Sequence, residues 1–133
     1  MMNLQSDTVT VAKPSATIVA FLSDLSNLQQ LMPEDRISDW EASETHCQFQ
    51  IKGLSRISFG LDRSEANGVY MVSQGKNPFP FQLNILVAPN DEGSCSVKIE
   101  FNGEANAFLK MMVEKPLTNF LNMLTAKLQE VQG

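Results

Sequence analysis

The sequence predicts an α+β fold in which a curved antiparallel sheet of about six to seven strands wraps around a long C-terminal helix. Two short helices are expected after the first strand. Three observations indicate this arrangement. Apolar and polar residues alternate through most of the segment 36–102, turn residues divide that segment at short intervals, and the segment from Ala105 onward returns to helical spacing.

The size and charge of the chain narrow its class. With 133 residues, it has the length of one domain, so a single domain over residues 1–133 is expected. Hydrophobic residues make up 43% and charged residues 19%, a balance that excludes bulk disorder. The net charge of −5 excludes a typical nucleic-acid binder, because such proteins neutralise phosphates with Lys and Arg.

The chain also lacks targeting and metal-binding patterns. Its first residues have neither the basic nor the apolar segment of a secretory signal, and no apolar run approaches the ~20 residues that span a bilayer. Cys47 and Cys95 fit no metal-ligand spacing, and each lies in an alternating apolar run, which predicts a small buried hydrophobic residue. We therefore expect a cytoplasmic protein with reduced thiols, no cofactor, no metal and no integral membrane association.

The N-terminal third predicts one strand and two helices. Leu4–Ala12 is rich in Val and Thr and is followed by Pro14, which predicts a strand. Apolar residues then recur at helical spacing over 16–32. Capping residues between Ser23 and Asn27 interrupt this segment, and Pro33 ends it, so two short helices are favoured over one straight helix.

The middle of the chain predicts an antiparallel meander with one apolar and one polar face. Asn67-Gly68 is a strong hairpin signal, and Asn90–Gly93 is a second turn. The strand-like segments are 36–44, 46–52, 57–62, 69–75, 79–87 and 95–102, of which the first is the least regular.

The C-terminal segment predicts one long helix. Pro116 lies inside it, and because proline has no N–H to offer the carbonyl of Met112, a kink is expected there. The apolar stripe comprises Phe108, Met112, Leu117, Phe120, Leu121, Leu124, Leu128 and Val131.

A sheet wrapped around one helix encloses a space that is typically apolar. Arg63 continues the inward phase of Phe59 and Leu61, which predicts a charged group at the rim of that space. The same side chains are equally consistent with a solid core, and the sequence leaves the two alternatives open. The residues expected to line a ligand cavity are Phe49, Phe59, Arg63, Met71, Phe81, Leu83, Ile99, Phe101, Phe108, Met112 and Phe120.

Catalytic groups are sparse. His46 is the only histidine and lies on the polar phase of its strand, so a solvated sheet-face side chain is predicted. The acidic pairs fall in loops, and no serine or cysteine lies in a nucleophile-elbow pattern. No catalytic residue is therefore assigned.

Three local patterns carry a resemblance to a known family. Val11–Ser15 followed by Val19–Asp24 resembles an opening strand and capped helix, Asn27–Pro33 a second short helix, and Asn106–Leu117 the tail of small uncharacterised bacterial members. Together with the order of elements, they resemble the START-like superfamily, also called SRPBCC. This superfamily has the helix-grip fold and includes the major birch pollen allergen, polyketide cyclases and lipid-transfer domains. The resemblance extends over essentially the whole chain, and it implies a fold more strongly than a function.

Three functions follow as hypotheses. The first is binding of a small hydrophobic molecule, lipid-like or polyketide-like, in an apolar cavity between sheet and helix. The alternative is an enzyme similar to the polyketide cyclases and dehydratases, which place His, Asp, Arg or Tyr in the cavity. The third is a protein-interaction module, which requires an exposed apolar or charged face that the sequence does not visibly offer. The ligand and the oligomeric state stay open.

Overall fold

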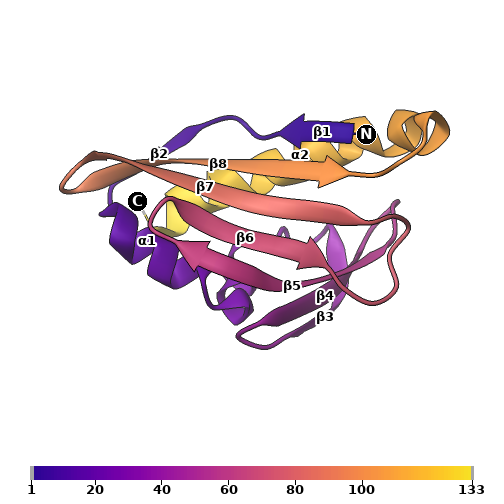
Figure 1. Cartoon of the computed structure of the whole chain (residues 1–133), viewed down its shortest axis with the longest axis horizontal. Helices are drawn as coiled ribbons and strands as arrows, with labels where there is room; N and C mark the ends of the chain where they lie inside the picture. The colour runs from indigo at the N-terminus through magenta and orange to yellow at the C-terminus, as the bar shows by residue number, and fades with distance from the viewer. Residues whose placement is uncertain (1, 133) are drawn as a thin grey trace.

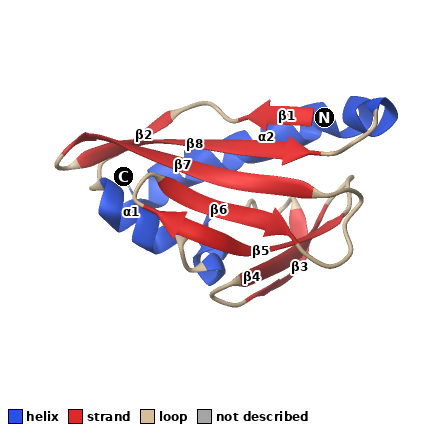
Figure 2. Cartoon of the chain, in the orientation of Figure 1, coloured by secondary structure: helices blue, strands red, loops and turns tan. Residues whose placement is uncertain are grey.

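The computed structural model describes residues 2–132, which form one antiparallel sheet with the helices gathered on one of its faces (Figures 1 and 2). Within these residues, no helix combines the length and apolar composition that a bilayer crossing requires. The elements in chain order are β1 (Met2–Gln5), β2 (Val9–Val11), α1 (Ser15–Leu22), the 3-10 helix η1 (Leu25–Leu31), β3 (Ile37–Ala42), β4 (His46–Ile51), β5 (Arg56–Glu65), β6 (Gly68–Ser73), β7 (Phe81–Asp91), β8 (Ser94–Gly103) and α2 (Ala107–Gln132).

The sheet has eight strands in the order β1-β8-β7-β6-β5-β4-β3, and β2 also pairs with β8. The α+β class, the meander and the long C-terminal helix are therefore confirmed. The strand count exceeds the predicted six to seven because the segment expected to be one strand, 4–12, forms two.

Ser6 explains the break between β1 and β2. Its N–H donates to the carbonyl of Ile99 at 2.9 Å, while its buried hydroxyl oxygen accepts from the N–H of Ile99 at 2.8 Å. A side-chain oxygen thus replaces a main-chain carbonyl in the ladder, and the strand pairing is interrupted there.

The predicted hairpin at Asn67-Gly68 joins β5 to β6. Gly68 pairs with Glu65 on one side and with Leu86 on the other. A Cβ atom at Gly68 would lie 2.6 Å from the carbonyl oxygen of Ile85. Only glycine fits there without a shift of the backbone.

The two short helices form as expected, separated by a capped turn. Asp24 accepts the N–H of Ser26 at 3.0 Å through Oδ1 and so caps η1. The apolar residues of both helices face the core: Ile18, Leu22, Leu25, Leu28 and Leu31 are buried.

The long helix α2 lies behind the sheet in Figure 1, and its first turns project beyond the end of the sheet. Two hydrogen bonds fix the part of α2 after Pro116, called its second half, to the N-terminal segment. Asn122 Oδ1 accepts from Asp7 N at 2.7 Å, and Gln129 Nε2 donates to the Thr10 carbonyl at 2.8 Å. Pro116 lies inside α2, and a bend there stays a prediction. Every buried residue of α2 follows Pro116: Leu117, Phe120, Leu121, Leu124, Thr125 and Leu128.

Candidate functional site

Aromatic rings form a continuous cluster between the sheet and α2. Phe81 stacks on Phe101 with ring centroids 4.9 Å apart, and Phe59 meets Phe81 edge-on at 6.3 Å. Phe49 links this group to the helix, because its centroid lies 6.0 Å from that of Phe120. These rings come from β4, β5, β7, β8 and α2, so the sheet and the helix are bridged by aromatic contacts.

The space that this cluster leaves empty is small. The cavity that contacts the larger number of core side chains, called the main interior cavity, has a volume of about 20 Å³, and its lining carries no charged or polar side chain. A space of that size holds about one water-sized sphere. Its lining is Leu28, Leu31, Met32, Phe49, Ile57, Phe59, Leu83, Ile85, Ile99, Phe101, Leu117, Phe120, Leu121 and Leu124.

A second cavity of about 30 Å³ lies beside the first half of α2 and includes Phe79, Phe81, Phe101 and Val113 in its lining. The interior is therefore packed nearly solid. The sequence left open whether these side chains line a ligand cavity or form a solid core. In this conformation they form a solid core.

Most of the predicted lining residues meet in this interior. Phe49, Phe59, Leu83, Ile99, Phe101 and Phe120 line the main cavity, and Phe81 lines the second with Phe101. Met71 is fully buried in the same core but lines neither cavity.

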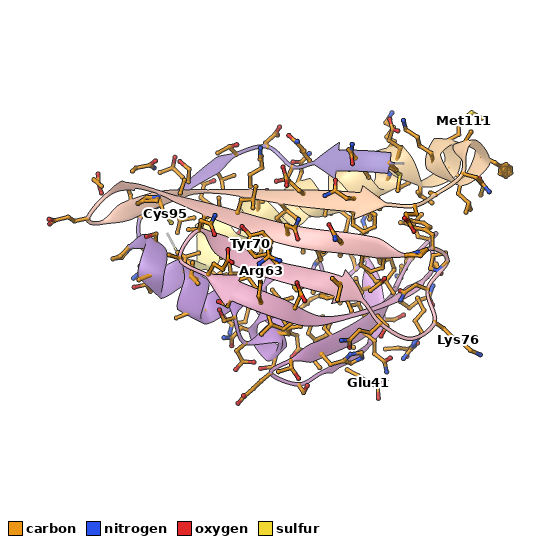
Figure 3. The ribbon with its side chains drawn as sticks, in the orientation of Figure 1. Glu41, Arg63, Tyr70, Lys76, Cys95 and Met111 are labelled. Carbon is orange, nitrogen blue, oxygen red and sulfur yellow. The ribbon has the colours of Figure 1, made fainter. Side chains whose placement is uncertain are left out.

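Arg63 does not lie at the rim of the interior, and its predicted inward phase was wrong. The pairing of β5 with β6 shifts by one residue after Leu61, so Arg63 is paired with Tyr70. A shift of one residue moves a side chain to the opposite face of the sheet. On the outer face, the Arg63 guanidinium lies 4.0 Å from the Tyr70 ring centroid (Figure 3). It also pairs with the carboxylates of Asp62 and Glu65, at an N–O distance of 3.1 Å in each case.

Phe108 and Met112 also lie outside the interior, contrary to the prediction. The inward face of the first half of α2 is formed by Leu109 and Val113, one position later in each turn. Phe108 and Met112 are therefore rotated by about 100° from the core side, and they are 63% and 60% exposed. With Met111, which is 82% exposed and lies at the projecting end of α2 (Figure 3), they form an exposed apolar face that the sequence did not reveal.

A surface groove of about 410 Å³ runs along α2 on the side of β3 and β4. This volume is within the range of small-molecule sites. The second half of α2 forms one wall, and the other is formed where β4 ends and turns into β5. Its lining residues are Arg36, Ile51, Lys52, Leu54, Pro116, Asn119, Phe120, Asn122, Met123 and Ala126.

Phe120 lines both the groove and the main interior cavity, and Ile51 and Leu54 line both the groove and the second cavity. Three side chains thus separate the groove from the interior. No single sequence pattern predicted the groove, because its walls come from three distant segments.

His46 has a more ordered environment than predicted. It is half-buried on the outer face, where Nδ1 lies 3.0 Å from Gln74 Oε1 and Nε2 lies 3.2 Å from the Ser58 hydroxyl. Ser58 is itself buried, and Asn77 binds its backbone N–H and carbonyl at 2.9 and 3.0 Å. A serine, a histidine and an amide in this order resemble a catalytic arrangement. Ser58, however, lines neither of the interior cavities nor the groove. Gln74 and Asn77 belong to the loop between β6 and β7, so these contacts fasten that loop to the sheet.

Cys47 and Cys95 are free and buried, as predicted. Burial raises the pKa of the Cys47 thiol to about 12 and also raises the pKa of Cys95. Neither thiol is therefore activated as a nucleophile. Within residues 2–132, no three His, Cys, Asp or Glu side chains gather closely enough to hold a metal ion.

Several lining residues were missed by the sequence analysis. Ile85 belongs to the same alternating run as Leu83, and Leu121 and Leu124 belong to the recognised helix stripe, so the pattern contained them. Leu28 and Leu31 enter from η1, whose position over the sheet depends on tertiary packing and not on a local pattern.

No family model and no curated protein matches this sequence. Solved structures do match. A START superfamily protein from Mycobacterium smegmatis superposes with a TM-score of 0.70 at 15% identity, over 98% of this chain and 96% of that one. Norcoclaurine synthase from Thalictrum flavum, in complex with dopamine and hydroxybenzaldehyde, gives a TM-score of 0.72 at 13% identity, over 98% and 85%. The di-domain ARO/CYC protein BexL from the BE-7585A biosynthetic pathway gives 0.68 at 10% identity, over 98% of this chain and 47% of that one.

Identities this low show the fold and not the activity. The chain has the helix-grip fold shared by START superfamily proteins and norcoclaurine synthase, and the resemblance found in the sequence is confirmed at that level.

Proposed function

We propose that this protein binds a small hydrophobic molecule between the sheet and α2, with the groove beside Phe120 as the way in. The observation that carries the proposal is the shared position of Phe120, whose ring lines both the open groove and the apolar interior. A ligand seated in the groove needs only this ring and its neighbours to move before it contacts the core.

Binding requires the interior to expand, because the two cavities together are too small for an organic ligand. We expect the part of α2 before Pro116, residues 107–115, to move and so allow this expansion. None of the α2 residues before Pro116 is buried, and both side-chain hydrogen bonds from α2 to the N-terminal segment come from Asn122 and Gln129, which follow Pro116. Mobile segments are drawn from the least stable parts of a fold.

The enzyme alternative is less well supported. Norcoclaurine synthase and the ARO/CYC protein show that catalysts use this fold. In this chain, however, the lining of the main interior cavity carries no titratable side chain, and His46 lies on the outer face of the sheet. General acid–base chemistry needs such a group within hydrogen-bond reach of the substrate.

Titration with a neutral apolar fluorophore that brightens in dry surroundings tests the proposal. We expect one-to-one binding and a rise in melting temperature on saturation, because a ligand selective for the folded state stabilises it. A variant with Phe108→Ser and Met112→Ser controls for adsorption to the exposed face of α2, and it should bind the fluorophore as the parent protein does. Absence of one-to-one binding, or its loss in this variant, would refute the proposal.

A further inference from the structure

Two cations stand together at one rim of the groove. Arg36 precedes β3, and Lys52 follows β4, and the two segments are held side by side by the Lys52 N–H, which donates to the Arg36 carbonyl at 2.8 Å. Both side chains are exposed, and both line the groove.

These cations are poorly neutralised by the protein itself. Within residues 2–132, Lys52 forms no ion pair, and Arg36 has only its exposed neighbour Asp35 at 4.0 Å. No acidic side chain lines the groove in the described part of the chain, although the protein has 15 Asp and Glu against 10 Lys and Arg. The groove is therefore a locally positive site on an acidic protein.

The floor next to these cations is apolar. Ile51, Leu54, Phe120 and Met123 line it, and the first three connect it to the interior cavities. Asn119 and Asn122 add two polar side chains on the α2 wall, and Asn122 already accepts a hydrogen bond from Asp7 N. A site with a cationic rim and an apolar floor fits a molecule with an anionic head and a hydrocarbon chain.

We propose that the groove selects single-chain carboxylates, with the carboxylate held at Arg36 and Lys52 and the hydrocarbon chain directed past Phe120 toward the interior. This inference rests on the proposed function and narrows it: the hydrophobic ligand is an anionic amphiphile. A guanidinium and an ammonium both bind carboxylate oxygens through charge-assisted hydrogen bonds. Because both are exposed, they supply selectivity for the anion while the apolar contacts supply most of the affinity.

A comparison of decanoate with decanol tests the inference, since the two molecules share a chain and differ in charge. Affinities are measured by displacement of the neutral fluorophore at low ionic strength, because salt screens exposed charges. The test variant carries Arg36→Gln and Lys52→Gln. The control variant carries Lys13→Gln and Lys76→Gln, which removes the same total charge from exposed positions that do not line the groove.

We expect the parent protein to bind decanoate about tenfold more tightly than decanol, the ratio that two exposed charge pairs supply. The test variant should lose this preference with its decanol affinity unchanged, and the control variant should keep it. If decanol binds and decanoate binds no more tightly, or if both variants lose the preference equally, the anionic selectivity is wrong while the proposed function stands. If neither molecule displaces the fluorophore, or if the test variant keeps the preference for decanoate, the anionic selectivity is also wrong, whereas the proposed function fails only if the fluorophore itself does not bind one-to-one.

Discussion

Phe120 on α2 and Phe49 on β4 lie with their ring centroids 6.0 Å apart, inclined at 35°. This is the aromatic contact that joins the helix to the sheet, and Phe49 is in turn stacked on Trp40 of β3 at 5.5 Å. Since Phe120 also forms part of the groove wall, the contact that stabilises the helix is the one a ligand must displace.

The first prediction compares two phenylalanines of the same helix. Phe120→Ala should lower the free energy of unfolding by about 3–5 kcal/mol, the usual cost of deleting a buried ring. Phe108→Ala is the matched control, and because that ring is 63% exposed, the cost should stay below about 0.5 kcal/mol. Urea denaturation measures both. Should Phe120→Ala fail to fold, Phe120→Leu provides a milder test, and similar losses at positions 108 and 120 would show that the burial assigned to α2 is incorrect.

The second prediction concerns the two halves of α2. Amide hydrogen exchange should be faster at residues 107–114 than at 118–129, because buried side chains and the hydrogen bonds of Asn122 and Gln129 stabilise only the second half. Addition of the fluorophore should slow exchange in the first half. Equal protection in both halves would mean that Pro116 is only a structural bend and that the helix does not open there.

The alternating strands could be predicted because one face of the sheet is buried and the other is polar. That pattern assigned Phe49, Phe59, Leu83, Ile99 and Phe101 to the inward face, and all five side chains are buried. Burial imposes a period of two on the side chains, so the period alone assigns the face wherever the pairing is regular.

The errors occur where a local irregularity changes the phase. The β-bulge after Leu61 has no recognisable sequence pattern. It places Arg63 on the outer face of the sheet, beside Tyr70. The error in α2 has another cause, because Leu109 and Val113 precede Leu117 at intervals of four residues and so continue its buried stripe. Phe108 and Met112 do not continue this spacing, so they were assigned to the wrong face. Cavity volume is equally hidden, because it depends on how the rings interlock.

The third prediction uses the buried thiols. Unfolded Cys47 loses its proton near pH 9, whereas burial raises the folded pKa to about 12. Between these two pKa values, Cys47 is deprotonated to a greater extent in the unfolded state than in the folded state. A rise in pH therefore favours unfolding. The stability that Cys47 contributes is therefore complete below pH 9 and is lost on the way to about pH 12.

Urea unfolding at about pH 8 and about pH 10 measures this effect, which for one thiol should lower the free energy of unfolding by about 1.4 kcal/mol in total between the two pH values. Cys47→Ala should make the decline shallower by that amount. If the free energy of unfolding falls equally with pH in the parent protein and in Cys47→Ala, the pH dependence comes from other groups. In the same experiment, a thiol reagent should modify Cys47 and Cys95 only after unfolding, because both are fully buried.

Entry of a hydrophobic ligand into the space between the sheet and α2 has a direct spectroscopic signature. Methyl-detected NMR with a saturating neutral apolar ligand tests it most directly, through intermolecular nuclear Overhauser effects. We expect such contacts to the methyl groups of Leu83, Ile99 and Leu121, which line the interior from β7, β8 and α2. Contacts confined to the exposed methionines Met111 and Met112, with none to these interior methyl groups, would contradict it.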